Sequence, residues 1–159
     1  MDRIKAKKII AICKMEMSDN VTQFRTAGSY RRGEEEIGDI DIVIIPRKGL
    51  RLQDCLPPSY DEMNWLGEKK AQIVIMGEKV DIHATTQDSF GAARMYFTGP
   101  ADWNIGMRIR ARTMGYKLNE YGLFSLETGM WLAGRYERDI FEKLDKLWKA
   151  PHRRGKRYT

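Results

Sequence analysis

The segment AGSYRRGEEEIGDIDIV, residues 27–43, joins a short glycine-rich loop to a strand that carries two aspartates. The alternation of Asp and Ile from residue 39 onward predicts a β-strand with its isoleucines on one face and its polar side chains on the other. Asp39 and Asp41 would then project from the same face with about 7 Å between their Cα atoms, because each residue of a strand advances about 3.3 Å. Two carboxylates so close need a cation, unless they are charges that protect a sheet edge from aggregation.

A third aspartate stands in a second segment with the same alternation. Residues 71–85, AQIVIMGEKVDIHAT, predict a hairpin around Gly77 in which Lys79, Asp81 and His83 share one face. If this strand pairs beside the first, three carboxylates converge on one patch of sheet. Hard oxygen ligands of this kind suit Mg²⁺ or Mn²⁺, with substrate phosphate and water completing the shell. Two such ions would hold both the attacking and the leaving oxygen of an in-line phosphoryl transfer.

The glycine-rich loop before the Asp-x-Asp strand supplies the other half of such a site, the part that binds phosphate. Gly28 and Gly33 allow a tight bend, so that backbone N–H groups and the Ser29 hydroxyl can reach phosphate oxygens. The two arginines between these glycines can neutralise the phosphate charge. A loop of this composition alone is more often a solvated turn. Followed by Gly38 and the Asp-x-Asp strand, it predicts a phosphate site.

The hydrophobic pattern of the rest of the chain predicts further elements. They are a packing helix at 3–17, a strand at 21–28, a connection with at most one short helix at 47–70, a helix at 101–115, a short hairpin at 117–134 and a helix at 135–148. Several large side chains are expected in the core, namely Trp65, Trp131, Ile140, Phe141, Leu144, Leu147 and Trp148. The basic tail, residues 149–159, is expected to be loose.

Composition sets broad limits on the protein. Twenty-eight Lys and Arg against 22 Asp and Glu give a net charge of +6, which favours a polyanionic partner such as nucleic acid. Cys13 and Cys55 have no metal-ligand or redox spacing, so they are expected to be ordinary thiols in a reducing interior. No segment is apolar enough to span a membrane, and the N-terminus is too charged for a signal peptide. We therefore expect a soluble intracellular protein with no membrane partner.

Seven motifs resemble, in colinear order over nearly the whole chain, those of the X-family DNA polymerases, of which the beta-type repair polymerase is a member. The motifs are GSYRRG (28–33), GDIDIVI (38–44), VDIHAT (80–85), YFTG (96–99), WNIGMR (103–108), KLNEYGLF (117–124) and RYERDIFEKL (135–144). The first two occur throughout a wider nucleotidyltransferase superfamily. The later motifs are specific to the polymerases.

The resemblance implies an α/β fold of the α+β kind. Residues 1–97 would form the catalytic palm, with a mixed or antiparallel sheet and packing helices. Residues 98–159 would form a smaller helical lobe that contains a short hairpin and selects the nucleotide. We expect no lyase domain and no DNA-gripping helix-hairpin-helix segment before residue 1, so the chain is expected to resemble the minimal viral members and to lack lyase activity.

The resemblance also implies roles for individual residues. Asp39, Asp41 and Asp81 would be catalytic and would bind two Mg²⁺ ions, with Mn²⁺ as an alternative. The nucleotide-binding residues would be Gly28, Ser29, Arg32, Gly38, Tyr96, Phe97, Gly99 and Asn104. Lys79 and Arg108 would contact DNA, and His83, Glu120 and Tyr121 would act in positioning. Tyr96, Phe97 and Gly99 match the segment that packs under the sugar and disfavours a 2′-hydroxyl, which implies a preference for deoxynucleotides.

Three departures from the family pattern bear on these roles. Lys79 and His83 stand where the beta-type enzyme has arginines, and Pro100 and Ala101 replace polar residues. Lysine keeps the charge but loses the planar fork of arginine. A histidine in the second strand could be a metal neighbour or general base, or only a hydrogen-bonding residue. The departures at His83 and Pro100 lead us to expect low fidelity.

The function that follows is template-directed addition of a deoxynucleotide to a primer 3′-hydroxyl, with short gaps in damaged DNA as substrate. DNA and deoxynucleoside triphosphate would be the partners, with a DNA ligase as a further candidate, and the protein is expected to be a monomer. One alternative is a template-independent nucleotidyltransferase acting on RNA, protein or a small molecule. A second is a catalytically inactive scaffold that binds nucleic acid.

Overall fold

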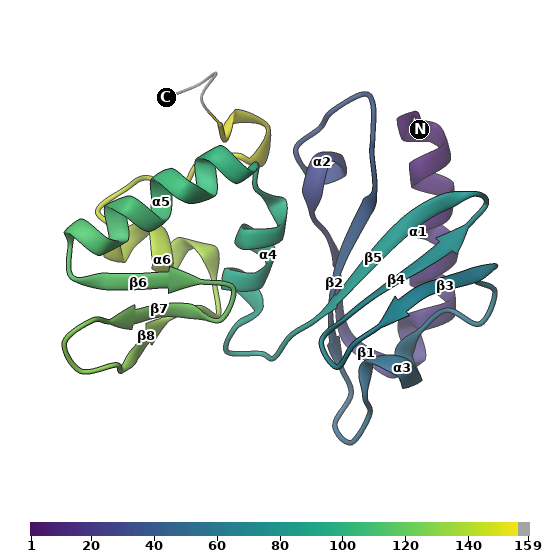
Figure 1. Cartoon of the computed structure of the whole chain (residues 1–159), viewed down its shortest axis with the longest axis horizontal. Coiled ribbons are helices and arrows are strands. Elements are labelled where there is room, and N and C mark those ends of the chain that lie inside the picture. Colours follow the sequence, from purple (N-terminus) through teal and green to yellow (C-terminus); the bar gives the residue numbers. More distant parts are fainter. Residues whose placement is uncertain (156–159) are drawn as a thin grey trace. The chain divides into compact units, whose positions relative to one another are not determined.

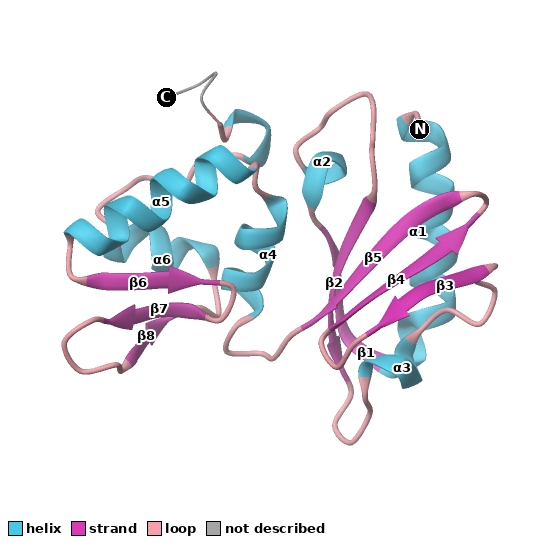
Figure 2. Ribbon diagram, in the orientation of Figure 1, coloured by secondary structure: helices cyan, strands magenta, loops and turns pink. Residues whose placement is uncertain are grey.

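The computed structural model describes residues 1–155, which form two compact units. The first unit runs from Met1 to Thr85, and the second begins at Thr86. Figure 1 labels the helices and strands, and Figure 2 shows that each unit combines helices with a sheet. Among the described residues, no helix is both long enough and apolar enough to cross a membrane. The predicted α/β fold with a mixed sheet and packing helices is confirmed.

The first unit is built on a five-stranded sheet in the order β1-β2-β5-β4-β3. β2 and β5 run parallel, and the other neighbouring strands run antiparallel. The strands are β1 (Val21–Thr26), β2 (Ile40–Pro46), β3 (Glu62–Leu66), β4 (Lys70–Ile75) and β5 (Glu78–Ala84). The predicted hairpin is the pair β4 and β5, and its short turn contains Gly77.

The helix α1 (Arg3–Met17) covers one face of this sheet and lies behind the strands in Figure 1. Asp2 caps the helix, since its Oδ1 accepts a hydrogen bond from the Lys5 backbone N at 2.8 Å. The buried side chains of α1 recur at helical spacing and pack in one core with the isoleucines of β2; they are Ala6, Ile9, Cys13 and Met17. The face of the sheet turned away from α1, here called the open face, carries Asp41 and Asp81.

Three local features of the first unit differ from the predictions. The GSYRRG segment was predicted as a tight turn, and it contains a single turn of helix, α2 (Gly28–Arg31). The connection 47–70 holds the short helix α3 (Leu52–Cys55), as predicted, but also the strand β3, which was missed. Every residue of β3 is exposed, so this strand shows no burial period in the sequence. Val43 and Ile45 are buried as well, so the second face of β2 is not polar throughout.

The second unit packs three α-helices with a three-stranded antiparallel sheet in the order β6-β7-β8. Its elements are α4 (Phe90–Thr98), α5 (Ala101–Thr113), β6 (Tyr116–Asn119), β7 (Gly122–Ser125), β8 (Trp131–Ala133), α6 (Glu137–Lys143) and the 3₁₀ turn η2 (Pro151–Arg153). One core joins α5 and α6 through side chains that include Trp103, Met107, Ile140 and Phe141. The predicted hairpin is thus part of a three-stranded sheet, and α4 was not predicted.

The end of the second unit departs most from the predictions. Helix α6 ends at Lys143, so only part of the predicted stripe is buried, and Leu147 is 93% exposed. Trp65, Trp131 and Trp148 were predicted in the core, but all three are exposed. The prediction of a loose tail is wrong for the described part of the tail, because Arg154 is only 3% exposed. Residues 156–159 of that predicted tail lie outside the described residues.

Candidate active site

The parallel pairing of β2 and β5 brings two of the predicted aspartates together. Asp41 and Asp81 are direct partners in the register of these strands. Paired residues of neighbouring strands project from the same face, so the two carboxylates meet on the open face of the sheet. Asp41 is partly exposed and Asp81 is buried. The expectation that the two strands pair side by side is confirmed.

His83 completes a cluster with these carboxylates. Its Nε2 lies 3.1 Å from Asp41 Oδ1, and one ligand atom from each of Asp41, Asp81 and His83 can be chosen so that all lie within 4.8 Å of one another. Two carboxylates and an imidazole are a donor set that fits a divalent metal ion. The buried position of His83 holds the ring beside Asp41. His83 was predicted as a positioning residue, but its imidazole also lies close enough to both carboxylates to be a candidate metal ligand.

Asp39 lies just before β2 and outside this cluster. Partial burial raises the pKa of its carboxyl group, and the nearby negative charges of Asp81 and Asp41 raise it further. The ammonium groups of Lys79 and Lys70 oppose this rise. Asp39 thus lies within electrostatic reach of both clustered carboxylates. Its role as a further metal ligand stays a prediction.

A hydrogen-bonded chain that the sequence analysis missed holds Asp81 from the other side. Gln72 Nε2 donates to Asp81 Oδ1 at 2.9 Å, and Asn64 Nδ2 donates to Gln72 Oε1 at 2.7 Å. The position of Gln72 beside Asp81 could have been predicted from the register of the hairpin. The pairing of Ile75 with Glu78 across the short turn places Gln72 opposite Asp81.

The glycine-rich loop contacts the same strand. The Ala27 backbone N donates to the Asp41 backbone O at 2.9 Å, and Gly28 has a positive φ of 59°. A Cβ atom at position 28 would overlap the Asp41 carboxylate, so glycine is required there. The loop and the candidate metal ligands are therefore fixed against each other.

The other predicted phosphate-binding residues lie on this loop or just after it. Ser29 is in α2, and its backbone O accepts a hydrogen bond from Glu34 N at 3.1 Å. Arg32 forms an ion pair with Glu34 at 2.8 Å. Gly38 has open space where a Cβ would lie. The structure thus leaves phosphate binding by these residues as a prediction.

The predicted nucleotide-selecting residues gather in the second unit. Asn104 Nδ2 donates to the Tyr96 backbone O at 2.7 Å, which ties α5 to the end of α4. The rings of Tyr96 and Phe97 meet edge to face, with 5.1 Å between their centroids. Tyr96, Asn104 and Arg108 line one small pocket. Gly99, which follows α4, has a positive φ of 61°.

Glu120 and Tyr121 form the turn between β6 and β7. The Ser89 hydroxyl donates to the Tyr121 backbone O at 2.8 Å, so this turn is tied to the start of α4. The predicted site residues thus form two groups. The group around Asp41 lies in the first unit, and the group around Asn104 lies in the second.

Comparison with known proteins agrees with this division into two groups. The family model described as DNA polymerase beta palm matches residues 3–94, and the model described as DNA polymerase beta thumb matches residues 93–155. Repair DNA polymerase X of African swine fever virus is 32% identical over 138 residues, which cover 80% of this chain and 78% of the viral protein.

Two cellular relatives are much longer than the matched segment. The DNA polymerase/3′-5′ exonuclease PolX of Bacillus subtilis is 29% identical over 127 residues, or 77% of this chain and 22% of the relative. DNA polymerase lambda of Rattus norvegicus is 27% identical over 158 residues, or 80% of this chain and 28% of the relative. Since the palm model covers more than half of the sequence and the viral relative is matched over most of its length, this chain belongs to the X family of DNA polymerases.

Proposed function

We propose that this protein is a template-directed DNA polymerase that adds a deoxynucleoside monophosphate to a primer 3′-hydroxyl and fills short gaps in damaged DNA. The observation that carries the proposal is the pairing of Asp41 with Asp81, with His83 beside them and the Gly28 loop against Asp41. The names of the viral and mammalian relatives support the same activity.

The residues of the first unit would hold the reacting groups. Asp41 and Asp81, with Asp39 as a further ligand, would bind two Mg²⁺ ions, for which Mn²⁺ is an alternative. Bound metal would activate the primer hydroxyl and neutralise charge that develops on the phosphates. His83 would keep Asp41 in place through the contact at 3.1 Å. The lyase activity of larger polymerases is not part of this proposal.

The loop residues would bind the triphosphate of the incoming nucleotide. Gly28 and Gly38 would present backbone N–H groups, and Ser29 would add a hydroxyl. Arg32, which pairs with Glu34 at 2.8 Å, would add a charge-assisted contact to phosphate.

The second unit would select the nucleotide. Tyr96, Phe97 and Gly99 would pack under the sugar, and Asn104 would contact the minor groove of the nascent base pair. We assign Arg108 and Lys79 to DNA, and Glu120 and Tyr121 to positioning of α5. In this division, residues 1–97 act as the catalytic palm and residues 98–159 as the selecting lobe. We also propose a monomer, with a DNA ligase as a candidate partner.

The test is extension of a labelled primer across a one-nucleotide gap, with each deoxynucleotide supplied singly and with Mg²⁺ or Mn²⁺. Asp81→Ala should abolish addition, whereas Asp19→Ala, which removes an exposed carboxylate outside the site, should not. Addition that follows the template base would support the proposal. Addition without regard to the template would indicate a template-independent transferase, and DNA binding without addition would indicate a scaffold.

A further inference from the structure

An exposed tryptophan lies in line with the candidate metal ligands. In the register of the first sheet, Asp41 pairs with Asp81, Asp81 with Gln72, and Gln72 with Trp65. The four side chains therefore share the open face, since partners in a row project from the same side of a sheet. Trp65 is on the edge strand β3, two strand spacings from Asp81, or about 10 Å.

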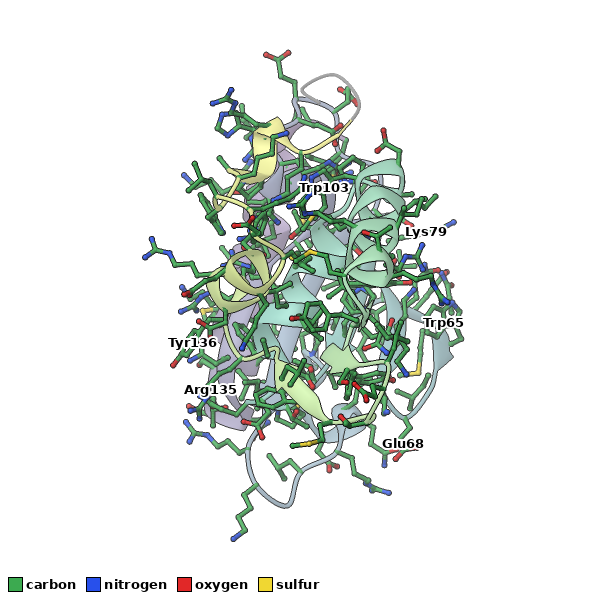
Figure 3. The ribbon with its side chains drawn as sticks, turned by 90° about the vertical axis from the view of Figure 1, so that its left-hand side faces the viewer. Trp65, Glu68, Lys79, Trp103, Arg135 and Tyr136 are labelled. Carbon is green, nitrogen blue, oxygen red and sulfur yellow. The ribbon has the colours of Figure 1, made fainter. Side chains whose placement is uncertain are left out.

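The surroundings of Trp65 are basic and linked to the site. Lys70 Nζ lies 5.0 Å from the centroid of the Trp65 ring. Lys79 lies on the same face of β5, two residues before Asp81, and Lys70 pairs with His83 in the register of β4 and β5. Figure 3 shows Trp65 and Lys79 along the same edge of the view. Asn64, the residue before Trp65, begins the hydrogen-bonded chain that ends at Asp81.

This combination fits a strand of nucleic acid. Trp65 is 42% exposed although its ring is large and apolar, and all five residues of β3 are exposed in the described part of the chain. An aromatic ring beside a lysine is the arrangement that binds a nucleotide strand, with the ring against the sugar or base and the ammonium against a phosphate. A bare edge strand could also pair with a second copy of this chain, but that occupant makes no use of Lys70 and Lys79.

We propose that Trp65 and Lys70 bind the primer strand upstream of its reacting end. The inference rests on the proposed function, which places the primer 3′-hydroxyl near Asp81. Each nucleotide of a duplex strand advances about 3.4 Å, so 10 Å from Asp81 corresponds to about the third nucleotide. Lys70 contacts the phosphate of that nucleotide, and the indole of Trp65 packs against its deoxyribose. The surface of the first unit that binds the primer thus extends from Asp81 to the edge strand β3.

The experiment measures binding of primer-template DNA without metal or nucleotide, so that it does not depend on catalysis. A set of primers carries one uncharged methylphosphonate at each of the six phosphates nearest the 3′-end. The variants are Trp65→Ala, Trp65→Phe and Lys70→Ala. The matched controls are Leu66→Ala, on the opposite face of β3, and Lys8→Ala, exposed on α1. Trp65→Thr serves as a second truncation that retains a strand-forming residue.

We expect Trp65→Ala and Trp65→Thr to weaken binding about fivefold, within the range for loss of one aromatic contact, and Trp65→Phe to retain most of the affinity. Lys70→Ala should reduce the slope of log affinity against log salt by about one. The methylphosphonate near the third phosphate should weaken binding by the wild type but not by Lys70→Ala. Both controls should bind as the wild type.

Equal binding by Trp65→Ala and the wild type would overturn the inference, as would equal effects of Lys70→Ala and Lys8→Ala at every phosphate. A change in oligomeric state on Trp65→Ala, with unchanged DNA affinity, would assign the edge to a second copy. Failure of the proposed function is recognised separately. In that case the wild type binds DNA with the same Trp65 dependence but adds no nucleotide.

Discussion

Gly28 lies directly against the carboxylate of Asp41, and a side chain at position 28 would overlap Asp41 Oδ2. The neighbouring Ala27 N also donates to the Asp41 backbone O at 2.9 Å. The loop that is proposed to bind phosphate and the strand that is proposed to bind metal are therefore positioned by these two contacts. A substitution in the loop is therefore expected to displace the proposed metal ligands, even though those residues themselves are unchanged.

Gly28→Ala should displace Asp41 and lower kcat by about 100-fold, the order of effect of a 1 Å misplacement in an active site. Gly49→Ala is the matched control, because Gly49 also has a positive φ but no atom within 4 Å of the added Cβ. Both variants should lose about 1 kcal/mol of unfolding free energy from backbone strain. Gap-filling rates and urea denaturation separate the two effects. Equal activity of the two variants would show that the contact does not position Asp41.

Gln72→Leu should lower activity 10- to 100-fold, the usual effect of removing a hydrogen bond to a metal-ligating residue. The reason is that Gln72 Nε2 no longer orients Asp81 Oδ1, which it contacts at 2.9 Å. Gln23→Leu on β1 makes the same chemical change at a position away from Asp81 and should be nearly neutral. Steady-state extension rates at saturating DNA and nucleotide provide the measurement. If both substitutions reduce the rate equally, the bond to Asp81 has no special role.

His83→Ala should weaken binding of a nitrogen-seeking metal more than binding of Mg²⁺. Imidazole favours ions such as Zn²⁺ and Ni²⁺, whereas carboxylates suffice for Mg²⁺. We expect about a tenfold loss for Zn²⁺ and a smaller loss for Mg²⁺, measured by calorimetric titration of the metal-free protein. His152→Ala, which changes the other histidine of the chain, should alter neither. Equal losses for both metals would mean that His83 acts only by holding Asp41.

The sequence allowed prediction of those parts of the site whose residues alternate strictly. The Asp-x-Asp segment and the second strand of the hairpin were predictable because polar and apolar residues alternate over residues 39–42 and 79–83. The turn at Met76 and Gly77, both with positive φ, fixes the hairpin register that places Gln72 opposite Asp81. The sequence of that turn therefore identifies Gln72 as the residue opposite Asp81.

Other parts of the fold carry no such periodicity. β3 is exposed along its whole length, so its pairing depends on β4 rather than on a buried face. In α4, Gly91 lies against the backbone of Tyr136, and that close contact is not visible in the local sequence. The helical stripe beyond Leu144 was extrapolated through Asp145, whose positive φ of 54° ends the helical path. Tertiary contacts decide these segments.

The Cys13 thiol supplies a pH-dependent contribution to stability. Burial raises its pKa to about 12, and the charge of Glu16 adds to the rise. Because the folded pKa exceeds the unfolded value of about 8.5, the contribution is fully present below pH 8.5 and is lost as pH rises toward 12. At pH 10 the wild type should have lost about 2 kcal/mol relative to Cys13→Ala, at 1.4 kcal/mol per pH unit. Urea denaturation at pH 8 and pH 10 tests this, and parallel losses in both proteins would contradict it.

Arg154 anchors the end of the second unit through a buried ion pair with Glu137. Arg154 Nη2 lies 3.0 Å from Glu137 Oε2, Nη1 lies 3.3 Å from Oε1, and the guanidinium stacks 4.9 Å from the centre of the Trp103 ring. Arg154→Met should destabilise the protein by about 3–5 kcal/mol, because Glu137 remains buried without its cation. The double variant Arg154→Met, Glu137→Leu should recover much of this loss, and the exposed Arg153→Met should have almost no effect. Urea denaturation of the full chain provides the measurement. If the double variant is less stable than Arg154→Met alone, the unpaired charge is not the cause, and the packing of Arg154 on Trp103 provides the stability.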